Sequence, residues 1–212
     1  MSQAAVKIPE SADVVSVVDQ FDDLRDIWSP EVAVAICNRT PNSGLHRWLA
    51  NLDPEKLPKG RVSITLDEVE TAVAGMFEDV QVAEDPHVQL LASDVAAQAT
   101  AFVNIMDIKR FTMRFDVVTN NACRKFHQDN VTARMLCAYR GRGTQYGVCD
   151  TGPEPDVIED MQTGAVGLFK GRRWPGYGAS AIYHRSPQIE GTGETRLLLV
   201  IDTSSCDPDC DC

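Results

Sequence analysis

The sequence predicts an α+β protein in which an N-terminal helical layer supports a C-terminal double-stranded β-helix, a cupin-like jelly-roll barrel. Apolar residues recur at helical spacing through most of the first half of the chain. From residue 109 onward they alternate with polar residues, as in half-buried strands. Helices followed by strands are typical of the α+β class. The 212 residues are enough for one structural domain with a full hydrophobic core.

Residues 1–108 are expected to form a mainly helical support region. Valines and leucines at helical spacing predict a first helix that ends near Trp28, and Pro86 is well placed to begin a long one. Short β-branched runs interrupt the helices. The expected elements are helices over residues 12–28, 43–52, 67–77 and 86–105, and strands over residues 32–37 and 62–65.

Residues 109–203 are expected to form the jelly-roll core. Phe111, Met113 and Phe115 alternate with polar residues, which predicts a half-buried strand, and turn-forming dipeptides separate the later apolar runs. The expected strands cover residues 111–117, 131–139, 165–169, 179–184 and 195–203. Residues 204–212 form a tail rich in cysteine and aspartate. Either a frayed end or a further metal-binding segment fits its composition.

Charge and composition exclude several classes of partner. The formal net charge is −11 and the isoelectric point is near 4.7, which argues against a nucleic-acid-binding face. No run approaches the roughly 18 apolar residues of a membrane span, and the first residues show no signal peptide. Seven cysteines at irregular spacing do not suggest a disulfide framework. We therefore expect a cytoplasmic protein with reduced thiols and no nucleic-acid or membrane partner.

A His-x-Asp pair is the strongest chemical signal in the chain. His127 and Asp129 are two residues apart where a strand begins, so their side chains can reach one ion from the same side. His184, at the end of a later strand, supplies a third ligand. Two imidazoles and one carboxylate can form a facial triad that leaves coordination positions open, as non-haem Fe(II) oxygenases require. We therefore predict a metal site with His127, Asp129 and His184 as its ligands and catalytic residues.

The charge of the predicted ligand set suggests the co-substrate. The three ligands leave a divalent ion with one positive charge, which suits a chelating oxoacid such as 2-oxoglutarate. Arg196 opens an otherwise apolar strand, and its guanidinium matches the geometry of a distal carboxylate. Arg134 and Tyr139 lie on the strand after the metal motif and are further candidates for binding the co-substrate. A structural salt bridge and core packing are their respective alternatives.

These residues resemble a known group of enzymes. His127-Gln128-Asp129, with Arg134 and Tyr139 and later His184 and Arg196, resemble the Fe(II)/2-oxoglutarate oxygenases of the prolyl-hydroxylase-like branch over roughly residues 111–203. Other segments resemble a bacterial family known only as a domain of unknown function (number eighteen twenty-six). They are Cys123–Asp129, Arg134–Tyr139 with Gly141–Thr144, Leu168–Gly171 and His184–Pro187. The resemblance implies a hydroxylase that uses Fe(II) and 2-oxoglutarate.

Two further features leave alternatives open. Cys123 precedes His127 by four residues, and thiolate with imidazole favours zinc. The same site, with the cysteines of the tail, could then serve a non-catalytic zinc-binding protein in metal homeostasis. Basic residues in the glycine-rich loops suggest a small-molecule or peptide substrate that is anionic, with solvated loop charges as the alternative. They are Arg140, Arg142, Lys170, Arg172, Arg173 and Arg185.

Overall fold

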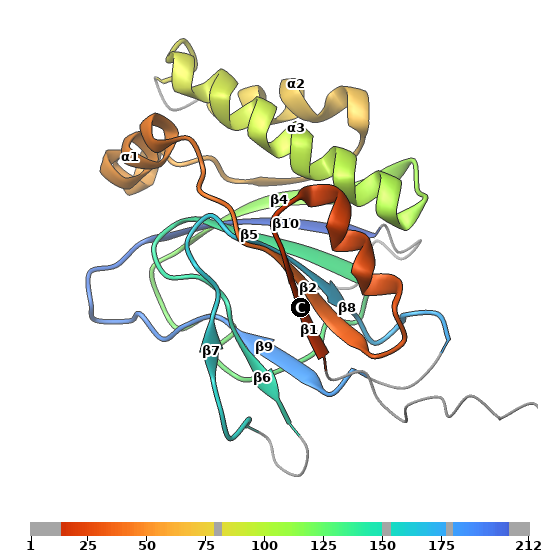
Figure 1. The fold of residues 1–212 in the computed structure, drawn as a ribbon. Coiled ribbons are helices and arrows are strands. Elements are labelled where there is room, and N and C mark those ends of the chain that lie inside the picture. The colour runs from red at the N-terminus through yellow and green to blue at the C-terminus, as the bar shows by residue number, and fades with distance from the viewer. Residues whose placement is uncertain (1–13, 79–81, 150–153, 177–179, 204–212) are drawn as a thin grey trace, which may run out of the picture.

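The computed structural model describes residues 14–78, 82–149, 154–176 and 180–203 (Figure 1). Its strands form two sheets. A seven-stranded sheet has the order β1-β2-β8-β5-β10-β4-β3, and a three-stranded sheet has the order β7-β6-β9. All described pairings are antiparallel except that of β1 with β2. The helices lie on one side of the large sheet and the small sheet lies on the other (Figure 1).

The bounds of the elements are as follows. The large sheet contains β1 (Val14–Val18), β2 (Val32–Cys37), β3 (Gly60–Thr65), β4 (Arg110–Val118), β5 (Ala133–Arg140), β8 (Val166–Lys170) and β10 (Arg196–Thr203). The small sheet contains β6 (Gln145–Val148), β7 (Glu159–Asp160) and β9 (Ile182–Arg185). The α-helices are α1 (Ser43–Asn51), α2 (Val69–Gly75) and α3 (Pro86–Met106). Short 3-10 helices cover η1 (Phe21–Trp28), η2 (Pro54–Lys56) and η3 (Leu66–Glu68).

The prediction of a helix over residues 12–28 is wrong. Within residues 12–28, the described part from Val14 onward forms strand β1 and the 3-10 helix η1. Four of the five β1 residues are valine, whose β-branched side chain favours strand over helix. β1 pairs in parallel with β2, so backbone hydrogen bonds between the two strands add to this local preference.

The N-terminal half contains strands as well as the helices that the sequence predicts. It supplies β1, β2 and β3, which pair with strands of the C-terminal half through β8 and β4. The strands expected over residues 32–37 and 62–65 are confirmed as β2 and β3. The expected helices near residues 43–52, 67–77 and 86–105 correspond to α1, to η3 with α2, and to α3. A mixed fold with a large, mostly antiparallel sheet results.

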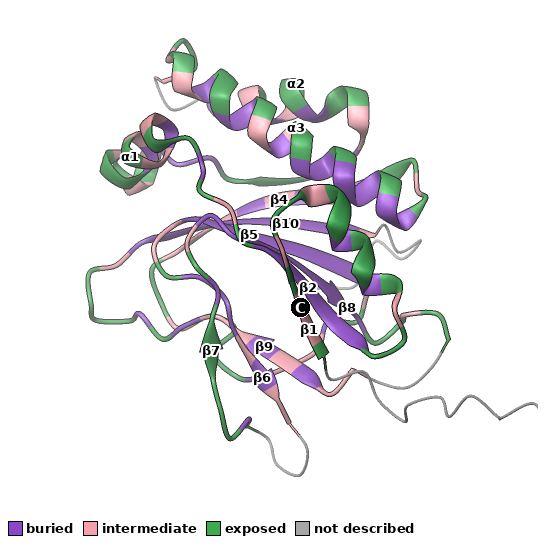
Figure 2. Ribbon diagram, viewed as in Figure 1, coloured by how far each residue is buried: buried purple, intermediate pink, exposed green. Residues whose placement is uncertain are grey.

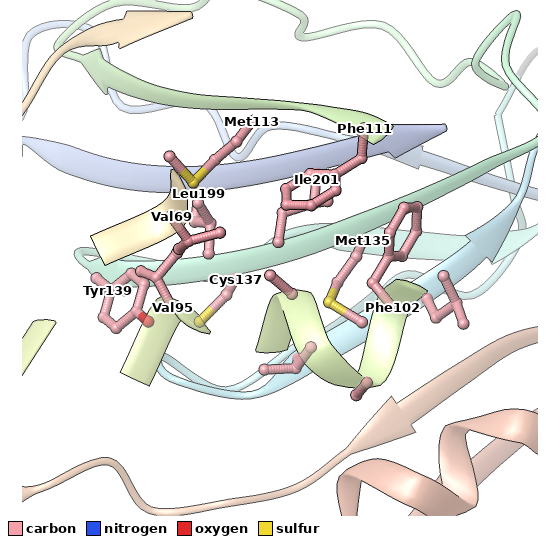
Figure 3. Packing of buried hydrophobic residues seen from close by; sticks show 14 of the residues in the cluster. Val69, Val95, Phe102, Phe111, Met113, Met135, Cys137, Tyr139, Leu199 and Ile201 are labelled. Atoms are coloured by element: carbon pink, nitrogen blue, oxygen red, sulfur yellow. The ribbon is translucent and has the colours of Figure 1, made fainter. Parts of the chain in front are cut away.

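The helices bury one face of the large sheet. α3 begins with Pro86 in its first turn, where proline costs no hydrogen bond, and the Asp85 carboxylate accepts from the His87 N–H. Its apolar side packs on the sheet, and its outer side is exposed (Figure 2). Figure 3 shows Phe102 of α3 among side chains of β4, β5 and β10, including Phe111, Met135 and Ile201. This core holds the strands that carry the candidate site.

The opposite face of the large sheet looks toward the small sheet. Side chains alternate along β5, so Leu136 and Ala138 join a second apolar cluster while Met135 and Cys137 face the helices. β6 and β7 are not among the strands that the sequence predicts. Among the residues that the structure describes, no helix has both the length and the apolar character needed to cross a membrane.

Candidate metal centre

Backbone pairing brings the two histidines of the predicted site together. His127 forms an isolated antiparallel bridge with His184 of β9, and each N–H donates to the other residue's carbonyl at 3.0 Å. Residues paired directly across antiparallel strands direct their side chains to the same side. The two imidazole rings accordingly lie 4.7 Å apart, centroid to centroid. The bridge thus places both rings at one point of the small sheet.

Asp129 completes the group. Its Oδ2 lies 3.0 Å from Nε2 of His184, and its Oδ1 lies 3.7 Å from Nε2 of His127. One ligand atom from each of the three residues lies within 4.8 Å of the other two. Atoms bound about 2.1 Å from one ion lie roughly 3–4 Å apart, so a small inward movement would complete the ligand set. The structure therefore brings together all three predicted metal ligands.

The hydrogen bonds around the ligands leave their binding atoms available. Nδ1 of His127 lies 2.9 Å from the Lys125 carbonyl oxygen, which can only accept, so Nδ1 carries the proton and Nε2 keeps its lone pair. Oδ2 of Asp129 is buried; its contact with Nε2 of His184 at 3.0 Å has the distance of an ion pair without the geometry of a hydrogen bond, and the oxygen has no hydrogen-bond partner within the described parts of the chain. A buried carboxylate oxygen without a donor favours a cation. The residues therefore fit a divalent metal ion.

Arg134 lies beside the metal ligands. It forms a buried salt bridge, which is the alternative to co-substrate binding that the sequence left open for this residue. Its Nη1 donates to Oδ1 of Asp129, while Nε and Nη2 donate to the two carboxylate oxygens of Asp202 at 2.6 and 2.8 Å. All three side chains are buried. Arg134 occupies one oxygen of Asp129 and leaves the other facing His184. Asp202 is not among the site residues predicted from the sequence, although a carboxylate at the end of an apolar strand signals a buried cation partner.

The electrostatics of the group favour an ionised Asp129 and a neutral His127. Burial by itself would raise the pKa of Asp129, but the adjacent His184 imidazole, Arg134 and His127 outweigh it and hold that pKa at about 2. Burial lowers the pKa of His127, and the neighbouring His184 lowers it further. At neutral pH the site thus presents a carboxylate and an unprotonated His127 imidazole, the forms that bind metal.

Arg196 lies fully buried at the start of β10. Its Nε donates to the Arg142 carbonyl at 2.7 Å and its Nη1 to Oγ of Ser186 at 2.9 Å. Burial lowers the pKa of Arg196 to about 10. Nη2 has no hydrogen-bond partner among the described residues. Ser186, which the sequence analysis missed, follows His184 by two residues, so Arg196 reaches the neighbourhood of the metal ligands through it.

Tyr139 lies away from the metal ligands, and Cys123 lines the cavity without joining them. Tyr139 faces the helical core, where its hydroxyl bonds to Asp94 and to Nε2 of Gln98. It lies on the opposite face of β5 from Leu136, which agrees with the core-packing alternative and separates it from the histidines. Cys123 is exposed and is not part of the three-residue ligand group found among the described residues. The tail cysteines lie outside the described residues.

A cavity of about 460 Å³ opens on the histidines, a size typical of small-molecule sites. Besides His127 and His184, its wall includes Arg134, Ser186 and apolar residues of β5 and β10. Of the basic loop residues predicted to attract an anion, only Arg185 is among those lining it. Arg140 instead donates to the Leu52 carbonyl, and Lys170 to the Ser29 carbonyl.

Comparison with known proteins assigns this chain to a family. A family model described as protein of unknown function (DUF1826) matches residues 18–202, which is most of the chain. The chain belongs to this family. The match confirms the family resemblance predicted from the segments around the metal ligands. No curated protein sequence matches the DUF1826 chain.

Solved structures similar to this DUF1826 protein include two plant dioxygenases. The dioxygenase for auxin oxidation from rice has a TM-score of 0.51 at 13% identity, covering 92% of this chain and 85% of that one. The Arabidopsis thaliana enzyme, in a binary complex with 2-oxoglutarate, has a TM-score of 0.51 at 9% identity and covers 94% and 95%. A 2OG-Fe(II) oxygenase family protein from Burkholderia pseudomallei has a TM-score of 0.45 at 14% identity and covers 91% and 94%. The two plant enzymes show that the DUF1826 chain shares their jelly-roll-like fold.

Proposed function

We propose that this DUF1826 protein is an Fe(II)- and 2-oxoglutarate-dependent oxygenase of the hydroxylase type. One observation carries the proposal: two buried polar atoms lack hydrogen-bond partners among the described residues, one on a metal ligand and one on an arginine that contacts the cavity residue Ser186. A bound cation would stabilise the unpaired Oδ2 of Asp129, and a bound anion would stabilise the unpaired Nη2 of Arg196. A metal ion and a dicarboxylate would satisfy both atoms, and the fold supports that pairing.

The ligand set suits the metal. His127, Asp129 and His184 would hold Fe(II) through two imidazole nitrogens and one carboxylate oxygen. Arg134 restricts Asp129 to one ligating oxygen, because it already occupies Oδ1. Three protein ligands leave other coordination positions for the co-substrate and oxygen. When bound, Fe(II) and 2-oxoglutarate would supply the oxidising chemistry, in which decarboxylation of the oxoacid is coupled to oxidation of a substrate.

The anion end of the co-substrate would be held by Arg196. Its guanidinium is oriented by the Arg142 carbonyl and by Ser186, so less conformational freedom is lost when a carboxylate binds. Ser186 is two residues beyond His184, roughly 7 Å along an extended chain. That separation suits a short dicarboxylate that chelates the metal with one end. Burial of Arg196 strengthens the attraction, because little water competes.

The test is spectroscopic and chemical. Fe(II) and 2-oxoglutarate added without oxygen should produce a weak visible charge-transfer band, and admission of air should produce succinate. His184→Ala should abolish both signals. His46→Ala, which changes a histidine far in sequence from the triad, should keep both. Tight zinc binding without affinity for 2-oxoglutarate, and no succinate from the wild-type protein, would contradict the proposal and favour the non-catalytic zinc-binding alternative.

A further inference from the structure

The cavity wall has a charged region apart from the two histidines that line it. Lys59 immediately precedes β3, and Arg114 and Asp116 lie on β4, at the edge of the large sheet. All three residues line the cavity. Gly60 pairs with Phe115, so Lys59 lies about one strand spacing from Asp116. Strand pairing therefore collects three ionisable groups on a wall that the proposed metal and co-substrate sites do not use.

This region carries an excess of positive charge. Nε of Arg114 donates to Oδ2 of Asp116 at 2.9 Å, and its Nη1 is 3.7 Å from Oδ2 of Asp202. Asp202 already accepts two hydrogen bonds from Arg134. Lys59 makes no ion pair with any residue that the structure describes. Two cations thus share one lining carboxylate, although the whole chain has a formal charge of −11.

An apolar floor lies beside these charges. Leu136 and Val200 are cross-strand partners on β5 and β10, and Val200 in turn pairs with Arg114 of β4. Leu198 pairs with Asp116. Leu136, Leu198 and Val200 all line the cavity and belong to the apolar cluster on this face of the sheet. A molecule in the cavity would meet a cationic edge and an aliphatic surface at once.

We propose that the substrate is an organic anion, with a carboxylate or phosphate attached to an apolar body. Its charged group would lie against Lys59 and Arg114, and its apolar part would cover Leu136, Leu198 and Val200, toward the metal ligands. This inference rests on the proposed function, because the metal site defines which end of the molecule reacts. The cavity wall, with one dominant sign of charge, concentrates such anions and favours them over neutral analogues of the same shape.

The experiment compares acids with neutral analogues. Protein loaded with redox-inert Mn(II) is titrated by calorimetry with 4-phenylbutyrate, 3-phenylpropyl phosphate and 4-phenylbutyramide, in the presence and in the absence of 2-oxoglutarate. At least one anion should bind ten or more times more tightly than the amide. Increasing salt should reduce this preference, since an exposed lysine is screened. The two anions distinguish a carboxylate substrate from a phosphate substrate.

Matched variants test the assignment to Lys59. Lys59→Glu should remove the preference for the anion, whereas Lys56→Glu makes the same charge change three residues away, outside the cavity lining, and should preserve it. Both variants should bind Mn(II) as the wild type does. Equal binding of acid and amide, no binding of either anion, or the same effect from both variants would overturn the inference. Failure of 2-oxoglutarate to bind would instead contradict the proposed function. The preference for the anion would still be measured in the titrations that contain no 2-oxoglutarate.

Discussion

Replacing Arg134 with methionine should destabilise the metal-free protein strongly. Arg134 is 8% exposed, and its partners Asp129 and Asp202 are 1% and 6% exposed. Removing one partner of a buried ion pair typically costs about 3–5 kcal/mol, because the remaining charge is left uncompensated. Here two carboxylates lose their cation together. Methionine keeps most of the length of the side chain, so the loss reports charge and hydrogen bonding more than volume.

Neighbouring groups reduce this cost toward the lower end of the range. Asp129 keeps the adjacent His184 imidazole, and Asp202 keeps the guanidinium of Arg114 at 3.7 Å. We therefore expect Arg134→Met to lower the free energy of unfolding by about 3 kcal/mol, a large share of the roughly 5–15 kcal/mol typical of a folded protein. Urea unfolding in the presence of a chelator measures this difference.

The control is Arg142→Met, since the Arg142 side chain is half exposed and pairs with the exposed carboxylate of Asp160 at 3.5 Å. Its loss should cost less than about 1 kcal/mol. A double-mutant cycle with Asp202→Asn should give a coupling energy of at least about 1.5 kcal/mol. A loss below about 1 kcal/mol for Arg134→Met, or no coupling, would refute the view that this buried ion pair stabilises the site.

Three other predictions concern single groups. Arg196→Met should weaken 2-oxoglutarate binding by about 10–100-fold, measured by calorimetry with Mn(II), because a charge-assisted hydrogen bond contributes roughly 1.5–3 kcal/mol; unchanged affinity would contradict the role of Arg196. Tyr139→Phe should cost about 1–2 kcal/mol in urea unfolding and leave metal and 2-oxoglutarate affinity unchanged, since its hydroxyl bonds only within the helical core. The pKa of Asp129, depressed from 3.8 to about 2, contributes stability that is complete above about pH 4 and is lost as pH falls through about 2. Between pH 5 and pH 2, the metal-free wild type should therefore lose about 2 kcal/mol more than Asp129→Asn; parallel curves would contradict this.

Local sequence patterns were sufficient to predict the helices and strands that have strong apolar periodicity or clear termini. Pro86 and the apolar stripe that follows it predict α3, and the alternation after Lys109 predicts β4. They failed at β1, where valines spaced as on a helix face also suit a strand. β6 and β7 were missed because short strands in glycine-rich loops carry little periodic signal, and their hydrogen bonds come from distant partners.

The candidate ligands could be predicted because their chemistry is rare and their spacing is short. His127 and Asp129 are two residues apart, and few other histidines compete for the third position. The partners that hold them could not be predicted in the same way. Asp202 is 68 residues from Arg134, and only the pairing of β5 with β10 brings the two side chains together.

The sequence by itself determined the kinds of group available for chemistry: two imidazoles, a nearby carboxylate and an arginine that opens an apolar strand. Only the tertiary structure decided which groups share a cavity, because side-chain direction depends on strand register. It turned Arg134 toward the ligands and Tyr139 toward the helices, although both lie on β5. It also brought Lys59, remote from the metal motif in sequence, to the wall of the same cavity, since β3 pairs with β4 at the edge of the sheet.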